Sequence, residues 1–397
     1  MKKSLIALAA LAATTAFAQS SVTISGAMDV GLVNQKFGNN TSAQNVSTGT
    51  NGASRLRFVG IEDLGGGTKA NFWLEMQPSF QDGTISSAGL FNRGAWAGLS
   101  DAKFGEIRLG RMGTNSVSAV CDIDQQGCYT GAYGGGILFS GQAAPGANYG
   151  ALFAANPTRG GVAQATGVKT PYATTTLAAG DAVTNVQASS TGAANQAGTS
   201  FAADSTRYVR AVRYSLPTLV AGLSLNGTYA YGQTGSTGGH TGNTTGFDGN
   251  YVNGPLKITA AYQKADADVA GGSNGELTTV GAIYNLGFAS VGAGVQSEKA
   301  DGSATALKFK KADAFALTAL FPMGATTPYI KYGERKYSGG TDGNLTTAKV
   351  TNIGVRYAFS KNTYVYADYM QNSAAMVSTT TQGSIKDQTN FGLTTNF

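Results

Sequence analysis

The chain contains little charge, few prolines, and almost no histidine or cysteine. Of its 397 residues, 13% are Asp, Glu, Lys or Arg, and it has 8 prolines, 2 cysteines and 1 histidine. Soluble domains average about a quarter charged residues, so an ordinary soluble surface is disfavoured. The single histidine, His240, lies in a glycine-rich stretch, where it is poorly suited to act as the general base of an enzyme. The composition therefore argues against catalysis, and we expect no cofactor and no metal centre.

The first 18 residues have the features of a cleaved signal peptide. Lys2 and Lys3 precede a short, largely apolar segment at residues 4–15, and the Ala-Phe-Ala sequence at 16–18 is a small-x-small cleavage site. A permanent membrane anchor is the alternative, but this segment is too short to cross a bilayer as a helix. We therefore expect residues 1–18 to be removed and the mature chain, 19–397, to be exported.

Long apolar runs are missing from the rest of the chain. No stretch after the signal peptide has the roughly twenty unbroken apolar residues of a transmembrane helix. An exported chain of this kind is either soluble or crosses a membrane as a closed β-barrel, because lipid leaves the edge of an open sheet unsatisfied. The net charge of +6 falls to +4 without the two signal lysines, an excess too small to indicate a nucleic-acid partner.

The residues that are abundant favour β-structure. The chain has 56 glycines, 18 tyrosines and 18 phenylalanines. A membrane barrel explains the low charge, because its lipid-facing surface excludes charged side chains. A glycine-rich secreted adhesin would share this composition, but such a protein would show repeats of fixed period, and we find none.

Apolar and polar residues alternate with a period of two in segments of about ten residues, as expected for tilted membrane strands. The pattern is clear at residues 22–32, 70–77, 223–231 and 256–263. Alternation puts opposite chemistry on the two faces of a strand. A soluble β-sandwich also alternates, but its strands usually have about five or six residues. The length of the segments therefore favours a membrane barrel.

Short turns and long polar connections also alternate along the chain. Short turns are predicted near residues 63–67, 100–103, 253–255, 285–287 and 359–361, and long loops near 34–53, 233–245, 299–307, 337–345 and 373–386. Short turns at one rim and long loops at the other are typical of outer-membrane barrels. About sixteen candidate strands can be counted, an even number in the range that such barrels use. The sequence thus predicts an all-β fold, a transmembrane antiparallel β-barrel.

One stretch interrupts this rhythm. From residue 113 to about 204 the chain is rich in Ala, Gly, Thr, Gln and Ser, and a loop of this length is either functional, disordered or a misread element. It contains the only cysteines, Cys121 and Cys128. In an exported protein these two cysteines are expected to form a disulfide.

Several motifs, in this order and spacing, resemble the general porins of β-proteobacteria. They are SVTISG at 21–26, SRLRFVGIEDLGGG at 54–67, FWLE at 72–75, FGEIRLGR at 104–111, and the terminal Phe397. The resemblance covers most of the mature chain and weakens at 141–203. It implies a homotrimer of sixteen-stranded barrels in the bacterial outer membrane, each with its third loop folded into the lumen. It also implies contact with outer-membrane lipid and lipopolysaccharide, and insertion by the barrel assembly machinery through Phe397.

A diffusion channel needs a wet lumen and charges at its narrowest point. Alternation turns Arg55 and Arg57 toward the lumen, and it puts Trp96 on the opposite face from Arg93. The resemblance maps the family's basic cluster onto Arg55, Arg93 and Arg207. The predicted constriction has Arg55, Arg57, Arg93, Arg111 and Arg207 on its basic wall, and Glu75, Asp122 and Asp124 on its acidic side, with residues 113–140 lining it. The alternative is that these charges only solvate the lumen.

Two arginines do not fit strict alternation. Arg111 is placed toward lipid with Ile107 and Leu109, and Arg210 is placed there with Tyr208 and Val212. A charge on that face costs about 2–4 kcal/mol at the middle of the bilayer. Either the strand ends or bulges at Arg111, or Arg111 lies at the rim.

These observations predict a passive diffusion channel for small hydrophilic solutes and ions, with a mild preference for anions. The alternative is a substrate-specific channel that binds one class of metabolite. A run of lumen-facing aromatic residues, or paired acids, would favour that alternative, and neither stands out in the sequence.

Overall fold

The computed structural model describes residues 20–37, 42–85, 90–125, 207–234, 240–241, 243–266, 274–301, 311–338, 347–372 and 385–397. The predicted signal peptide lies outside these residues, as do Cys128 and the larger part of the stretch 113–204. Within the described ranges, no helix is both long enough and apolar enough to cross a membrane.

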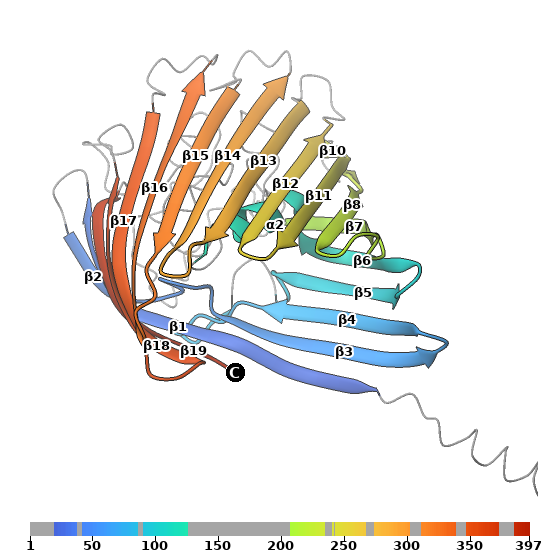
Figure 1. Ribbon diagram of the computed structural model, residues 1–397, viewed down its shortest axis with the longest axis horizontal. Helices are drawn as coiled ribbons and strands as arrows, with labels where there is room; N and C mark the ends of the chain where they lie inside the picture. Colours follow the sequence, from blue (N-terminus) through green and yellow to red (C-terminus); the bar gives the residue numbers. More distant parts are fainter. Residues whose placement is uncertain are drawn as a thin grey trace, which may run out of the picture.

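Antiparallel strands make up most of the described structure (Figure 1). The strands are β1 (Ser21–Phe37), β2 (Ser42–Thr48), β3 (Arg55–Gly65), β4 (Thr68–Met76), β5 (Gly94–Asp101), β6 (Gly105–Gly113), β7 (Arg207–Ser215), β8 (Leu223–Ala230), β9 (Gln233–Thr234), β10 (His240–Thr241), β11 (Thr244–Asn253), β12 (Leu256–Ala265), β13 (Asn274–Asn285), β14 (Ser290–Asp301), β15 (Lys311–Leu320), β16 (Thr326–Ser338), β17 (Thr347–Ala358), β18 (Thr363–Asn372) and β19 (Ile385–Asn396). One helix, α2 (Asn115–Ile123), follows β6.

The sheet closes because its first and last strands pair with each other. β1 pairs with β19 from Ala27↔Asn396 to Phe37↔Ile385. On its other side, the first half of β1 pairs with β3 and the second half with β2, so β2 and β3 share one position in the ring. β8 pairs directly with β11, past the small β9–β10 hairpin. The described strands thus form a closed barrel with 16 strand positions, which confirms the predicted fold.

Side chains alternate between an exposed apolar outer face and a buried polar inner face. On β1, Ile24 and Leu32 are exposed, whereas Asp29 is buried. On β19, Phe391 is exposed and Asn390 is buried. The pleat of a strand requires this alternation, and an apolar outer face suits a barrel surrounded by lipid.

The short turns depend on glycine. In the turn between β3 and β4, Gly66 and Gly67 have φ angles of +64° and +94°. Side chains with a Cβ rarely adopt this left-handed region, so glycine allows the two strands to reverse within two residues. The predicted short turn at residues 63–67 is therefore confirmed.

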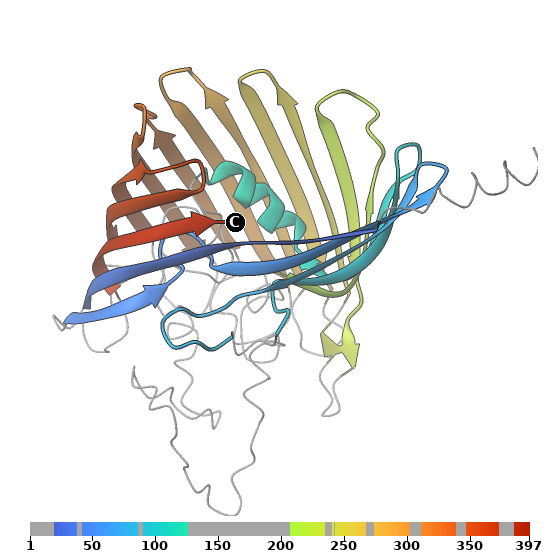
Figure 2. The same ribbon diagram turned by 90° about the horizontal axis from the view of Figure 1, so that it is seen from below.

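Helix α2 lies inside the barrel, against the inner wall of β11–β14 (Figure 2). Its N-cap is Thr114, whose hydroxyl accepts a hydrogen bond from the Val117 N–H at 3.2 Å. Two wall glycines make room for it. A Cβ built on Gly246 would lie 2.2 Å from Asn115 Oδ1, and one on Gly281 would lie 2.3 Å from Ile123 Cδ1. The glycines thus allow close packing of helix on wall.

Candidate functional site

The inner wall of β3 and β4 holds a buried cluster in which two arginines share one glutamate. Arg57 Nε lies 3.1 Å from Glu75 Oε2, and Arg93 Nε lies 2.5 Å from Glu75 Oε1. Arg93 Nη1 also donates to Gln77 Oε1 at 3.2 Å. The side chains of Glu75 and Arg93 are 8% and 6% exposed, whereas Arg57 is 27% exposed. Glu75 therefore orients both guanidinium groups at the lumen wall.

Two further arginines contact the backbone of the segment that leads into β5. Arg207 Nε donates to the Arg93 carbonyl at 2.6 Å, and Arg111 Nε donates to the Asn92 carbonyl at 2.7 Å. Arg57 and Arg93 thus pair with Glu75, and Arg111 and Arg207 contact two adjoining carbonyls at Asn92 and Arg93. We call these four arginines and Glu75 the arginine cluster. Arg55, the fifth basic residue predicted, donates from its Nε to the Ala53 carbonyl at 3.1 Å, at the start of β3.

Arg111 lies two residues before the end of β6, where the pairing with β7 is irregular. The register passes from Gly110↔Ala211 to Met112↔Tyr208, so β7 has one residue more than β6 between these two pairs. On its other side Arg111 pairs regularly with Ala95 of β5. The extra residue of the bulge is therefore on β7, and the bulge expected at Arg111 itself is not found on β6.

Arg210 lies opposite this irregularity. Arg210 is exposed and has a φ of 51°. Among the described residues, it is the only one besides glycines that has a positive φ. Its Nε and Nη2 donate to the Tyr231 carbonyl at 3.3 and 3.1 Å. The extra residue of β7 lies between Tyr208 and Ala211, so both of these side chains are on the inner face, and Arg207 is buried next to Tyr208. Strict alternation had placed Tyr208 on the outside, and this prediction was wrong.

Trp96 was also placed on the wrong face. Arg93 precedes β5, which begins at Gly94, so the alternation of the strand does not extend to it. The Trp96 ring lies parallel to that of Trp73, with 6.2 Å between ring centroids, and it packs against the buried Met112–Tyr208 cluster. Trp96 and Arg93 therefore share the inner face.

The two acids predicted on the opposing loop lie on or beside α2, and both pair with lysines of the wall. Asp122 Oδ1 is 2.6 Å from Lys257 Nζ on β12, and Asp124 Oδ1 is 2.6 Å from Lys331 Nζ on β16. In the ring, β3–β5 and β11–β14 lie on roughly opposite sides (Figure 2). The lumen therefore runs between the arginine cluster and α2.

Sequence reasoning missed two buried parts of the inner wall. Arg213 Nη2 lies 3.1 Å from Asp248 Oδ1, and both side chains are nearly buried. Asp29 Oδ1 accepts hydrogen bonds from the Thr50 N–H at 2.7 Å and the Tyr366 hydroxyl at 3.0 Å, and Asp29 Oδ2 accepts one from Thr394 at 2.5 Å. A period of two counted within β7 would have found Arg213. The fold of residues 49–54 onto Asp29 had no local signal.

The remaining predicted residues are placed as follows. Cys121 is disulfide-bonded, and its predicted partner, Cys128, lies outside the described residues. Phe397 exchanges backbone hydrogen bonds with Gly26 at 2.9 and 3.2 Å, so the last residue pairs with β1. Among the residues that the structure describes, no group of three or more His, Cys, Asp or Glu side chains could hold a metal ion.

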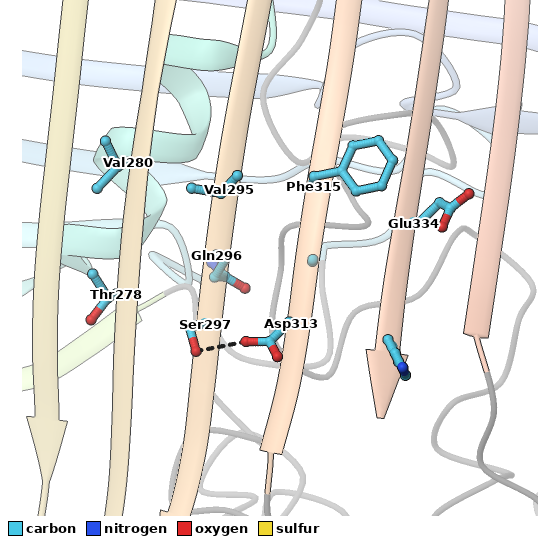
Figure 3. A pocket seen from close by; sticks show the side chains of 10 residues that line it. Thr278, Val280, Val295, Gln296, Ser297, Asp313, Phe315 and Glu334 are labelled. Carbon is cyan, nitrogen blue, oxygen red and sulfur yellow. Dashed lines mark hydrogen bonds between the residues drawn. The ribbon is translucent and has the colours of Figure 1, made fainter. Parts of the chain in front are cut away.

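A pocket on the barrel is separate from this site. It lies over the outer face of β13–β16, where Val280, Val295 and Phe315 form its apolar part (Figure 3). Asp313 accepts a hydrogen bond from the Ser297 hydroxyl at 2.8 Å beside them. These side chains point away from the lumen, so the pocket faces the membrane rather than the solute path.

A closed barrel with an apolar outer wall, a charged inner wall and an internal helix defines the protein as a β-barrel of the bacterial outer membrane. The chain belongs to the Gram-negative porin family, whose profile matches residues 4–375. The match begins within the predicted signal peptide and continues through β18.

Three known proteins illustrate this relationship. Outer membrane porin protein 32 of Delftia acidovorans is 50% identical over 116 residues, which are 28% of this chain and 32% of that protein. The alignment thus spans about a third of the relative's length. The anion-selective porin from Comamonas acidovorans has a TM-score of 0.68 at 22% identity, covering 96% of this chain and 100% of that one. OmpT of Vibrio cholerae (in-vitro folded, trimer form) has a TM-score of 0.59 at 13% identity, covering 95% and 99%. At these identities, the two structures share the fold.

Proposed function

We propose that the protein is a passive diffusion channel for small hydrophilic solutes and ions, rather than an enzyme, and that it prefers anions. The arginine cluster carries this proposal. Two of its guanidinium groups pair with the carboxylate of Glu75, and the other two contact the adjoining carbonyls of Asn92 and Arg93, so the cluster holds four positive charges and one negative charge. The solved structure with the TM-score of 0.68 is itself described as an anion-selective porin, which supports the same preference.

The opposite side of the lumen adds little negative charge. Asp124 pairs with Lys331 and Asp122 with Lys257, so each acid beside α2 is offset by a lysine. In a narrow passage with low-dielectric walls, a few uncompensated charges decide which ions enter. The arginine cluster therefore dominates the field at this level, and anions are drawn into the passage.

Single-channel recording in a planar bilayer tests the proposal. The purified mature protein should give large, stepwise, roughly ohmic currents, and the reversal potential under a salt gradient should have the sign of anion preference. Folded, inserted protein that conducts nothing would overturn the channel. Conductance with a cation-biased reversal potential would overturn the role given to the arginine cluster.

We also propose a lipopolysaccharide contact on the outer face of β12–β17. Exposed lysines recur there at strand ends next to the long connections, and they are Lys264, Lys299, Lys311, Lys336 and Lys349. One of them, Lys336, lines the outward pocket of Figure 3 together with Asp313 and Glu334. A row of ammonium groups at one rim suits the phosphates of the outer leaflet. Replacing all five with Gln should reduce the lipopolysaccharide that copurifies, and unchanged copurification would contradict the contact.

A homotrimer is proposed on the other side of the barrel. The outer face of β1 and β19 presents Ile24, Leu32, Phe391 and Leu393, all exposed in the single chain. A contiguous apolar face away from the lysine row fits a subunit interface, and the OmpT structure named above is described as a trimer form. Cross-linking in the outer membrane should give trimers, and monomers alone would contradict this arrangement.

Export and insertion complete the proposal. Residues 1–18 are removed during export, and the barrel assembly machinery recognises the C-terminal Phe397. N-terminal sequencing of the mature protein should begin at Gln19. Deleting Phe397 should lower the amount of folded barrel in the outer membrane while leaving the exported precursor unchanged.

A further inference from the structure

Four inner-wall side chains from neighbouring strands form a ladder of rings and guanidinium groups. The guanidinium of Arg57 on β3 lies 5.1 Å from the centroid of Trp73 on β4. Trp73 is parallel to Trp96 on β5, with an interplanar angle of 9°. On the far side of Trp96, the guanidinium of Arg108 on β6 lies 4.5 Å from the ring centroid. We call these four residues the tryptophan ladder.

The ladder is built into the wall. Trp73 and Trp96 are direct cross-strand partners, which brings their side chains together on one face. A Cβ on Gly94 would lie 2.8 Å from Trp73 Cδ1, so glycine at this position allows the indole to lie against β5. Each arginine is held by a carboxylate: Arg57 by Glu75 at 3.1 Å, and Arg108 by Glu106.

The ladder also meets the lumen. Both indoles are half-buried, and the side chains of Arg57 and Arg108 are 27% and 31% exposed. Each guanidinium has five N–H donors, and its carboxylate partner takes only part of them. Arg57 belongs to the arginine cluster as well, so an anion drawn to that cluster reaches the tryptophan ladder directly.

We infer that the tryptophan ladder is a weak binding site for aromatic carboxylates that pass through the channel. The carboxylate contacts Arg57 or Arg108, and the ring packs edge-to-face against the exposed parts of the indoles. Aromatic pairs in such arrangements gain binding beyond the area they bury, and a transported solute must bind weakly enough to leave. This inference rests on the proposed channel function, and it names one class of solute for it.

The chain offers an unusually direct probe, because its two tryptophans are the two rings of the ladder. Protein labelled with 5-fluorotryptophan should show two ¹⁹F resonances, which the variants W73F and W96F assign. The labelled, folded barrel is titrated in detergent with benzoate, with cyclohexanecarboxylate of similar size, and with benzylammonium as the aromatic cation. Binding is read from the resonances whether or not the protein conducts.

Benzoate should move both resonances saturably. Cyclohexanecarboxylate should require about two- to tenfold higher concentrations, which is the range expected from one aromatic contact. Benzylammonium should produce no saturable shift. Equal affinity for the two carboxylates, or no saturable shift with benzoate, would overturn the inference.

Variants separate the ladder from general effects on the barrel. W96L should weaken benzoate binding read at Trp73, whereas W96F should retain it, and R108Q should weaken benzoate and cyclohexanecarboxylate alike. Tyr262→Leu, an aromatic change on the outer face of β12, should leave binding unchanged. Bilayer recordings of the same proteins show whether the channel conducts. If the protein conducts normally but benzoate shifts neither resonance, the binding site at the tryptophan ladder is refuted and the channel function stands. If benzoate shifts the resonances but the protein does not conduct, the channel function is refuted and the binding site stands.

Discussion

Lys331 Nζ on β16 lies 2.6 Å from Asp124 Oδ1 at the end of α2, and both side chains are almost wholly buried. A second pair on the same helix, Lys257 and Asp122, has the same separation of 2.6 Å but is 33% and 23% exposed. Equal geometry with unequal burial makes the two pairs a matched comparison. The buried pair ties the end of α2 to the wall, and the exposed pair adds little to that attachment.

The first prediction follows from this comparison. Lys331→Met leaves the Asp124 carboxylate buried without its ammonium, which should lower the free energy of unfolding by about 3–5 kcal/mol. Lys257→Met should cost under about 1 kcal/mol, because water screens the pair. The double variant Asp124→Leu/Lys331→Met should recover most of the loss. Urea unfolding measures all three, and equal effects of the two lysine variants would contradict the burial argument.

The second prediction concerns ion selectivity. Replacing Arg55, Arg93 and Arg207 by Gln in one variant should shift the anion-to-cation permeability ratio several-fold toward cations. The reason is that three positive charges are removed from the lumen wall. Glu75→Gln should shift it toward anions, since the arginines then lose their carboxylate. Reversal potentials measure both, and Lys311→Gln/Lys336→Gln on the outer face serves as the control. An unmoved reversal potential in the triple variant would show that these arginines do not select.

The third prediction concerns salt. The Debye length falls from about 10 Å at 0.1 M to about 3 Å at 1 M ionic strength. Anion preference that comes from wall charges should therefore decline as the mean salt concentration rises at a constant gradient ratio. Preference that stays constant across this range would point to selection by direct contact.

The fourth prediction tests how α2 is seated. Gly281→Val would place its Cβ 2.3 Å from Ile123 Cδ1 and 2.8 Å from the Ala293 carbonyl, so the helix must move. Such overpacking costs about 1–3 kcal/mol, and the displaced helix should change single-channel conductance and increase current noise. Gly52→Ala is the control, since a Cβ there meets nothing within 4 Å. Wild-type conductance in Gly281→Val would show that α2 does not set the passage.

The fifth prediction addresses the fold of residues 49–54. The Asp29 carboxylate accepts hydrogen bonds from the backbone N–H groups of Thr50 and Asn51 and from Tyr366. Asp29→Ala should destabilise the protein by about 1.5–3 kcal/mol, because hydrogen bonds to a charged group are lost and donors are left unpaired. Limited proteolysis should then cut this segment faster than in the wild type. Unchanged cleavage would contradict its attachment through Asp29.

Much of the inner wall could be predicted from residues near each other in sequence. Arg57, Glu75 and Trp73 point inward because each lies within a regular strand with a clear period of two. The same reasoning failed at Trp96 and Tyr208, since Arg93 precedes its strand and β7 is irregular at Arg210. The positions of bulges and strand ends depend on the hydrogen-bonding register with the neighbouring strand. The local alternation of apolar and polar residues does not predict that register.

The amino-acid sequence by itself determined the closed barrel and its two faces. Lipid requires every backbone group to be paired within the sheet. The alternation of apolar and polar residues then directs the apolar face of each strand toward lipid and the polar face toward the lumen. Only the tertiary structure decided which charges meet. Asp124 and Lys331 are 207 residues apart in the chain. Arg93 contacts Glu75 and Arg207, and these three residues come from three separate segments. Their pairing depends on ring closure and on α2 lying against β11–β14, which brings residues distant in the chain within a few ångströms.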